Sequence, residues 1–404
     1  MRKNIEISVT AFVVILLLPQ LLSAQSPKVT GRYVGAGPQR SLTRLQSPDD
    51  SDIEPEFELH RFSDDVNHRS VTPIGFDDQI PPLPESAETI DDLRTDTNCC
   101  VQCFEFWEHR NAVWGEYLYL RPRGADVIYA TPVNGTLSTS VPVGPQATTN
   151  FGFNSGFRIG GSKAIDSCSS FTTNYTWYQA AATDSISLPG GGGSFLRADT
   201  VHPSTVDVAA DSLAARAISN FNMQSVDLNY RAIIWHGNTY AVNYLIGVKY
   251  ARVQQQFGAT YSISGTTNVN TNVDFNGVGP RFGLEGERSL GNCGLLLYSK
   301  AAVNFLMGSN SANYLQSNIF TGIQAQTALR ETQIVTVPEF ELGGGWQSCN
   351  GCFRLTAGYY VTAWCNMMTT SEYLSTVRET PNSFERQMKT LTLDGLNARA
   401  EWRF

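Results

Sequence analysis

The twelve residues LDGLNARAEWRF (393–404) alternate in polarity. From residue 396 onward the apolar residues are Leu396, Ala398, Ala400, Trp402 and Phe404, and the residues between them are Asn397, Arg399, Glu401 and Arg403. Successive side chains of a β-strand point to opposite faces, so this period of two predicts a strand with one oily face and one charged face. Terminal residues are poorly ordered unless they are tied down, so the aromatic end predicts a strand held in a sheet.

The same alternation recurs upstream and predicts an all-β chain. The clearest example is YAVNYLIGVKYARV (240–253). Strands are expected near 113–121, 151–163, 168–179, 222–235, 239–263, 268–288, 293–306, 332–348, 352–365 and 391–404. The two long strands within 239–288 either extend beyond a membrane or split at 254–256 and 276–279, which gives ten or twelve strands in all.

The connections between these strands sort by length. Tight turns are expected at 164–168, 236–238, 289–293 and 348–352. Long loops are expected at 122–150, 180–221, 307–331 and 366–390, and the 264–267 connection is short but occupies a long-loop position. Short turns at one end and long loops at the other are typical of an antiparallel transmembrane outer-membrane β-barrel, with periplasmic turns and extracellular loops. A soluble secreted β-sandwich is the alternative fold.

The N-terminal quarter differs in composition. Residues 1–24 combine Arg2 and Lys3 with an apolar run from Ala11 to Leu18 and small residues before Gln25, which predicts a secretory signal peptide. Residues 25–97 are expected to be a disordered acidic linker, because like charge and low hydrophobicity cannot offset chain entropy. A docking segment or a weak divalent-cation site is the alternative interpretation of this linker. The barrel is assigned to 98–404, in the outer membrane with membrane lipid as its partner.

Composition excludes several functions. The net charge of −8 argues against nucleic acid as a partner, because phosphate binding needs a basic surface. The signatures of phosphate, zinc and acyl-transfer sites are missing from the sequence. His109, His202 and His236 do not fall in register with a Ser or Asp that would make a nucleophile–base pair. We therefore assign no catalytic residue, no cofactor and no metal, and we predict that the protein is not an enzyme.

Three segments carry a family resemblance: WGEYLYLRPRGADVIYA (114–130), FGFNSGFRIGGS (151–162) and the closing LDGLNARAEWRF. Over roughly 104–404 the chain resembles the Legionella major outer membrane protein family of pore-forming barrels. The resemblance implies a β-barrel with pore-forming activity, and passive diffusion of small solutes or ions through a polar lumen is the function expected. A structural or surface-interaction barrel with little conductance is the alternative.

Charged residues on the polar strand faces are expected to line the lumen, because intramembrane charges must face water or one another. The predicted pore-lining residues are Asp227, Asn229, Arg231, Lys249, Arg281, Glu285, Glu287, Arg354, Arg399, Glu401 and Arg403. The competing interpretation is a salt-bridged, filled interior, since ten or twelve strands enclose a narrow lumen. At the chain end, Trp402 and Phe404 resemble the signal that barrel-assembly machinery reads. Association into a homo-oligomer is left open.

Cysteines in an exported chain predict disulfides, because the compartment is oxidising. The candidates are Cys99, Cys100, Cys103, Cys168, Cys293, Cys349 and Cys352, which all fall on the tight-turn side. Cys349 and Cys352 flank an Asn-Gly turn and are expected to bridge across it. A metal or redox role for this CxxC is the alternative, without a second CxxC or an adjacent histidine to support it.

Overall fold

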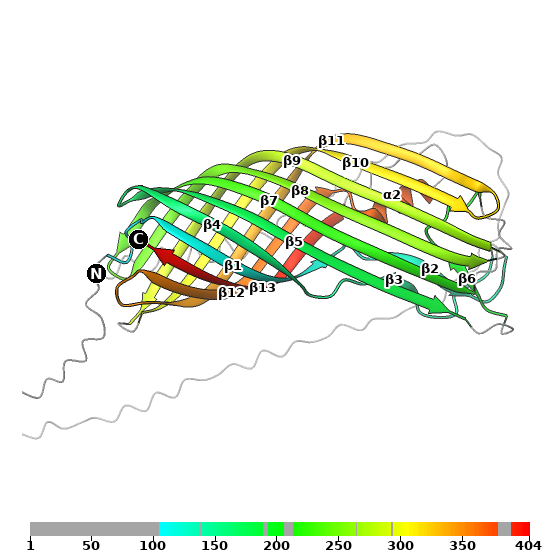
Figure 1. Ribbon diagram of the computed structural model, residues 1–404, viewed down its shortest axis with the longest axis horizontal. Coiled ribbons are helices and arrows are strands. Elements are labelled where there is room, and N and C mark those ends of the chain that lie inside the picture. The colour runs from blue at the N-terminus through cyan, green and yellow to red at the C-terminus, as the bar shows by residue number, and fades with distance from the viewer. Residues whose placement is uncertain are drawn as a thin grey trace, which may run out of the picture. The chain divides into compact units, whose positions relative to one another are not determined.

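A computed structural model describes residues 105–137, 139–188, 193–205, 213–263, 265–291, 294–378 and 389–404. Ten antiparallel strands form a closed barrel in the order β1-β13-β12-β11-β10-β9-β8-β7-β5-β4 (Figure 1). Their bounds are β1 Ala112–Arg123, β4 Asn154–Asp166, β5 Ser169–Ser187, β7 Ala214–Gly237, β8 Tyr240–Ile263, β9 Gly265–Leu290, β10 Leu295–Asn318, β11 Gly322–Gln347, β12 Phe353–Met367 and β13 Lys389–Arg403. The sandwich alternative is therefore wrong. The predicted signal peptide and acidic linker lie outside the described residues.

Strand β13, which carries the closing alternation, completes the barrel. Strand β1 pairs with β13 on one side, with Val113 opposite Trp402, and with β4 on the other side, with Ala112 opposite Ser162. Closure leaves no free edge in this part of the sheet, which removes the aggregation risk of an edge strand. Among the described residues, no helix is long and apolar enough to cross a membrane.

The strands on one side of the barrel are long, and all of them except β8 exceed the predicted lengths. β5 and β7–β11 run for 19 to 26 residues, whereas β1, β4, β12 and β13 have 12 to 15. The predicted loop at 307–331 is wrong, because β10 and β11 continue through it to a hairpin at 319–321. The loop at 180–221 is likewise shortened by β5 and β7. The split of 239–288 into extra strands is wrong too, since β8 and β9 each remain one strand.

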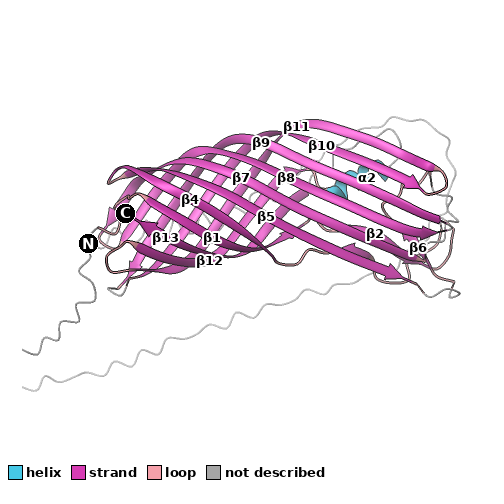
Figure 2. Cartoon of the chain, viewed as in Figure 1, coloured by secondary structure: helices cyan, strands magenta, loops and turns pink. Residues whose placement is uncertain are grey.

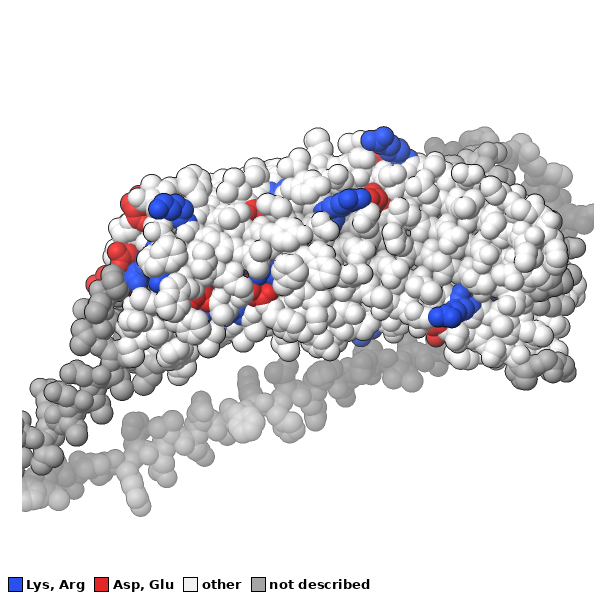
Figure 3. Space-filling view, viewed as in Figure 1, with Lys and Arg blue, Asp and Glu red and all other residues white. Residues whose placement is uncertain are grey.

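The outer surface changes polarity along these long strands. Near the tight turns the outward residues are apolar, and this surface ends in a row of directly paired residues: Val226, Tyr250, Val278, Met307 and Ile334. The next outward row is polar on all five strands: Gln224, Arg252, Asn276, Ser309 and Thr332. A strand needs only about 9–11 residues to cross a bilayer, so β7–β11 extend well beyond the apolar surface. Much of the surface visible in Figure 3 is free of charged side chains.

Four further elements occupy the long connections at the end away from the tight turns (Figure 2). They are β2 (Val127–Val133), β3 (Ala147–Thr149), β6 (Phe195–Ala198) and α2 (Thr370–Arg378). β2, β3 and β6 form a small separate sheet. Tyr129 of this sheet and Tyr373 of α2 belong to one buried cluster with inward side chains of β7–β10. Sequence patterning missed these elements.

Helix α2 has a defined start. Thr369 Oγ1 accepts a hydrogen bond from the Glu372 backbone N–H at 3.4 Å, and Glu372 Oε2 accepts one from the Thr369 N–H at 3.1 Å. This reciprocal pair is a capping box, which satisfies backbone donors at a helix start. Gln255 of β8 holds the same end, because it donates to the Met368 carbonyl and accepts from the Thr370 N–H. The helix is therefore anchored to the inner wall of the barrel.

Candidate functional site

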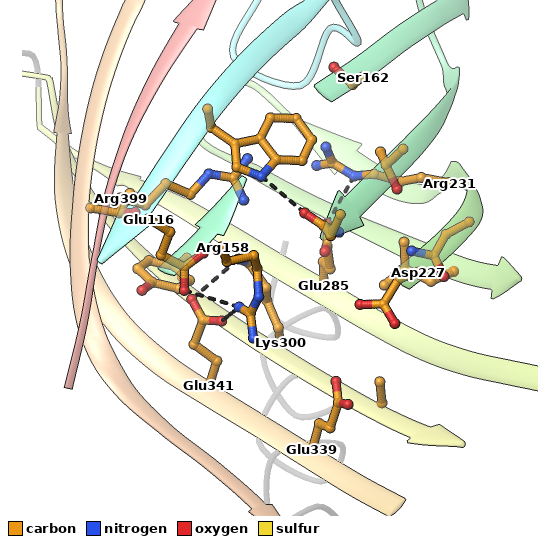
Figure 4. Close-up of a pocket in the computed structure, with 18 of the residues that line it drawn as sticks. Glu116, Arg158, Ser162, Asp227, Arg231, Glu285, Lys300, Glu339, Glu341 and Arg399 are labelled. Atoms are coloured by element: carbon orange, nitrogen blue, oxygen red, sulfur yellow. Dashed lines mark hydrogen bonds and ion pairs between the residues drawn. The ribbon is translucent and has the colours of Figure 1, made fainter. Parts of the chain in front are cut away.

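The predicted pore-lining residues gather inside the barrel around one chamber (Figure 4). Ten of the eleven line it: Asp227, Asn229, Arg231, Arg281, Glu285, Glu287, Arg354, Arg399, Glu401 and Arg403. Lys249 is the exception, and it lies beside the chamber in ion pairs with two of the chamber's acids. Inward alternation on five strands therefore places these residues together.

Several chamber residues were missing from the prediction: Trp114, Glu116, Arg158, Tyr298, Lys300, Glu339, Glu341 and Tyr360. Their sequence signal is the same period of two. Glu339 and Glu341, for example, alternate with Phe340 and Leu342 on β11, and Leu342 is exposed on the outer face. These residues occupy inward positions on β1, β4, β10, β11 and β12.

One group of chamber charges centres on Lys249, whose side chain is 5 % exposed. Its Nζ lies 2.9 Å from Asp227 Oδ1 and 2.9 Å from Glu339 Oε1. Arg281 Nη1 lies 2.7 Å from Glu339 Oε2 and 4.0 Å from Asp227 Oδ1. Strands β7, β8, β9 and β11 each supply one member, so the group ties four strands together across the lumen.

A second group joins β1, β4, β10 and β11. Arg158 Nη1 lies 3.0 Å from Glu116 Oε1 and 3.8 Å from Glu341 Oε2, and Lys300 Nζ lies 3.2 Å from Glu341 Oε1. Asn397 of β13 donates to both glutamates at 3.0 and 2.9 Å. Neither carboxylate is left without a charged or polar partner, which buried charges require.

A third group lies toward the tight turns. Arg231 Nε is 3.0 Å from Glu285 Oε2, and Arg354 Nη1 is 2.9 Å from Glu287 Oε2. Glu401 forms ion pairs with two arginines: its Oε2 lies 2.6 Å from Arg399 Nη2, and its Oε1 lies 2.7 Å from Arg403 Nε. The Arg399 guanidinium also lies 4.1 Å from the Trp114 ring centroid, within cation–π range.

The chamber is small and nearly neutral. Its volume of about 90 Å³ holds a few water molecules. Eight basic side chains face seven acidic ones: Arg158, Arg231, Lys249, Arg281, Lys300, Arg354, Arg399 and Arg403 against Glu116, Asp227, Glu285, Glu287, Glu339, Glu341 and Glu401. The mixed charge leaves no strong preference for one sign of ion.

An apolar layer fills the lumen beyond the chamber, on the side away from the tight turns. Its members form one buried cluster to which every barrel strand except β4 contributes. The largest fully buried side chains in it are Leu118, Leu120, Tyr178, Phe221, Phe275 and Trp364. In this conformation the apolar layer, with the small sheet and α2 beyond it, closes the lumen.

Residues 105–111, here called the mouth segment, pack into the tight-turn end of the lumen. Phe106 is buried against Ala241, Leu296 and Tyr298. The Trp107 ring lies 4.2 Å from the ring of His236, near the end of β7. The His109 backbone N–H donates to the Ser167 carbonyl at 2.9 Å. The segment therefore contacts β5, β8 and β10 across this end of the barrel.

His109 fixes the mouth segment through both ring nitrogens. Nδ1 lies 2.9 Å from Ser170 Oγ, and Nε2 lies 2.9 Å from Asn243 Oδ1. The sequence prediction that no histidine pairs with a strand serine is wrong here, because the two residues are brought together by the fold. All three side chains are buried, and the adjacent cavity measures about 20 Å³, too small for a substrate. A nucleophile must be reached by its substrate, so in this conformation the arrangement serves to hold the segment.

Acid should loosen the mouth segment. Burial, and then the Arg231 charge, lower the pKa of His109 from 6.5 to about 4. Facing charges on other strands are Glu285, Glu287, Glu401 and Arg403, with Glu108 and Arg110 on the segment itself. A lowered histidine pKa means that the docked state gains stability above pH 6.5 and loses it as pH falls from about 6.5 to 4. We expect a loss of roughly 2 kcal/mol after allowing for solvent screening.

Hydrogen exchange of residues 105–111, corrected for intrinsic rates, checks this expectation over that pH range. The control is His109→Asn, which has no titrating ring. Its exchange should be faster at pH 7 and should not change between pH 6.5 and 4. Equal acid acceleration in both proteins would contradict the assignment to His109.

The disulfide prediction is corrected in part. Cys168 and Cys352 carry free thiols, so the predicted bridge from Cys349 to Cys352 across the Asn-Gly turn is wrong. The turn is held by other bonds, such as Cys352 N–H to Asn350 Oδ1 at 3.2 Å and Phe353 N–H to Ser348 Oγ at 3.0 Å. Cys99, Cys100, Cys103 and Cys293 lie outside the described residues. Within the described ranges, no cluster of three His, Cys, Asp or Glu side chains is arranged to hold a metal ion.

Comparison with known proteins gives a family match over most of the chain. A family model described as Legionella pneumophila major outer membrane protein precursor matches residues 107–404. No curated protein sequence matches the chain. Similar solved structures include the outer membrane protease OmpT from Escherichia coli, with 8% identity, a TM-score of 0.38 and coverage of 74% of this chain and 99% of that chain. A Pseudomonas aeruginosa FadL homologue has 8% identity, a TM-score of 0.21 and coverage of 74% and 90%.

Proposed function

The chain belongs to the Legionella major outer membrane protein family, and from this premise we propose that it is a pore for small ions or polar solutes, closed in the conformation described here. The protein is located in the outer membrane, so its tight turns face the periplasm. The observation that carries the proposal is the charged chamber inside the barrel. Charges inside a membrane protein mark pathways for ions or solutes when they face a hydrated lumen.

The chamber supports small cargo. Ten strands enclose a narrow lumen, whereas open aqueous porins have about 16–18. The basic and acidic side chains are interleaved around the same cavity, so ions of either sign find a counter-charge there. Small ions and polar solutes with little charge are therefore the cargo proposed.

The apolar layer is the proposed gate. Hydrophobic constrictions block ions by excluding water, even without complete steric closure. Phe221 and Phe275 of this layer are fully buried, and α2 lies beyond it against the inner wall. Conduction then requires the layer to become wet and α2 to move.

A structural barrel with little conductance is the second candidate. It is favoured by the pairing of the chamber charges with one another, as with Lys249 between Asp227 and Glu339. Paired charges hold strands together and leave little free charge for a solute. In this candidate the long extracellular strands carry the function by binding partners.

Planar-bilayer recording of the full chain, after a gel-shift check of folding, separates the two candidates. The pore predicts rare, discrete conductance steps whose ion selectivity changes in Arg231→Ala or Arg354→Ala. The structural barrel predicts a folded protein that stays silent under all voltages and in all variants. Silence of this kind would overturn the pore proposal.

We propose in addition that Trp402 and Phe404 guide assembly through the barrel-assembly machinery. Both side chains lie on the outer face and are more than half exposed, so they contribute little to the barrel's own packing. Phe404→Ala should lower the amount of assembled barrel in cells several-fold yet leave refolding in detergent nearly unchanged. Heat-shift gels measure both quantities, with exposed Phe320→Ala at the opposite end as the control. Equal losses in cells and in detergent would indicate a stability effect instead.

Association into a homo-oligomer is compatible with either function.

A further inference from the structure

Beyond the apolar surface, the long strands present an outward face rich in amide side chains. Four amides lie side by side in one row across β7, β8, β9 and β10: Asn220, Gln256, Asn272 and Asn313. Each is directly paired in register with the next, so the row spans about 14 Å at the usual strand spacing. On β8 the row lies six positions past Tyr250, the last apolar outward residue, or about 20 Å along the strand. The row therefore faces the cell exterior.

The neighbouring row makes the surface hollow. Its members are Ile218, Gly258, Asn270 and Leu315, again paired in register. Together the two rows line a shallow groove of about 500 Å³. None of the side chains lining it is charged. Ile218 and Leu315 place apolar surface at its two sides.

Packing does not account for Gly258. A Cβ at this position would meet only Asn270 Oδ1, at 3.3 Å, and its backbone does not adopt the left-handed conformation that favours glycine. Glycine inside a strand costs roughly 0.5–1 kcal/mol relative to alanine. Glycine in a strand often marks a place where a ligand approaches closely. The missing side chain leaves the floor of the groove open.

The amides are likewise unexplained by the fold. Asparagine is depleted in strands, yet three of the four amides in the row are asparagines, and Asn272 and Asn313 are direct cross-strand partners. In the described part of the chain, the side chains of Asn220, Gln256, Asn270, Asn272 and Asn313 make no hydrogen bond. Each amide offers a carbonyl acceptor and two N–H donors. A residue type that is unfavourable for the local secondary structure, and that makes no compensating contact in the fold, is expected at functional positions.

We propose that this groove binds an uncharged saccharide outside the cell. Neighbouring hydroxyl groups of a sugar ring both donate and accept, which matches the paired donors and acceptors of an amide row. The C–H face of the ring fits the apolar flanks at Ile218 and Leu315. The uncharged lining favours a neutral sugar over an acidic one. The sugar comes either from the cell's own surface polysaccharide or from free oligosaccharide in the surroundings.

The test uses the full chain in detergent and two sets of probes. The first set is soluble neutral gluco-, manno- and galacto-oligosaccharides, with acidic oligosaccharides for comparison. The second is purified lipopolysaccharide from the same cells. Binding of the first set alone points to free sugar, and binding of lipopolysaccharide alone points to the cell surface. Wild-type protein is expected to bind lipopolysaccharide or at least one neutral oligosaccharide with a dissociation constant below about 1 mM.

Three variants locate the binding. The double variant Asn272→Ala/Asn313→Ala removes two adjacent amides, and Gly258→Leu fills the groove floor. Each should weaken binding at least about tenfold, or about 1.4 kcal/mol. The control is Asn222→Ala. Asn222 is an outward amide one row closer to the apolar surface and does not line the groove, so this variant should leave binding unchanged. The lumen is not involved, so conductance is expected to be the same in all three.

Any of four results would overturn the proposal. They are binding of neither lipopolysaccharide nor any soluble neutral oligosaccharide at about 10 mM, stronger binding of acidic oligosaccharides than of either, affinities unchanged in both groove variants, or an effect of Asn222→Ala equal to theirs. A change of oligomeric state in the groove variants without saccharide binding would assign the face to contacts between copies of the chain.

Discussion

Lys249→Met should cost about 3–5 kcal/mol of unfolding free energy, the usual cost of breaking a buried ion pair from one side. The substitution leaves Asp227 with only Arg281, 4.0 Å away, while both side chains stay nearly fully buried. Glu339 loses one of its two cations. Methionine fills the space of the lysine stem, so the loss reports the charge and not a cavity. Urea unfolding of the refolded barrel in detergent measures it.

Lys300→Met is the matched control. Its side chain is 25 % exposed, and it pairs with Glu341, which keeps Arg158 and Asn397. The expected loss is therefore about 1 kcal/mol or less. Adding Asp227→Asn to Lys249→Met removes the stranded charge and should recover part of the stability. Equal losses for the two lysine variants would mean that the chamber is hydrated enough to screen its charges.

The sequence predicts the barrel and the chamber for one physical reason. Lipid outside and polar groups inside impose opposite polarity on alternate residues, as with Val226 and Leu228 facing out and Asp227 and Asn229 facing in. That contrast in polarity is visible in the amino-acid sequence alone. It places ten of the eleven predicted residues around the chamber without any knowledge of the pairing.

The same contrast explains what the sequence left out. On β9 the inward residues change from apolar Phe275 to charged Arg281, while the outward residues change from polar Asn276 to apolar Val278. The alternation continues, but the polarity of its two faces reverses where the strand leaves the apolar surface. If each strand is assumed to keep one apolar and one polar face along its whole length, the half of the strand beyond the apolar surface has the pattern of a polar loop. The apolar layer and the anchoring of α2 arise from contacts between segments that are distant in the sequence. The periodicity of single strands does not predict such contacts.

Wetting the apolar layer and removing α2 together should turn a nearly silent barrel into a conducting one. Leu306 and Val335 are a directly paired couple on β10 and β11, both fully buried in the layer. Leu306→Ser with Val335→Thr gives water hydrogen-bonding partners there, and a Gly/Ser linker in place of 370–378 removes the helix from the space beyond. Barriers in series block until both are open, so each change alone should leave the barrel nearly silent. The combined variant should show steps at least about tenfold more frequent than wild type, because each 1.4 kcal/mol removed from the closed state shifts the equilibrium tenfold.

Folding of the combined variant is checked by its gel shift before recording, since polar groups in the layer lower stability. If that variant does not fold, Val335→Thr with the linker is the milder form, because threonine keeps the shape of valine. A folded variant that stays silent would place the closure elsewhere and favour the structural barrel. Conduction by the linker protein alone would identify α2 as the main barrier and the apolar layer as already wet. Recordings of the layer variant, the linker variant and the combined variant thus locate the barrier, because each protein leaves a different part of the lumen filled.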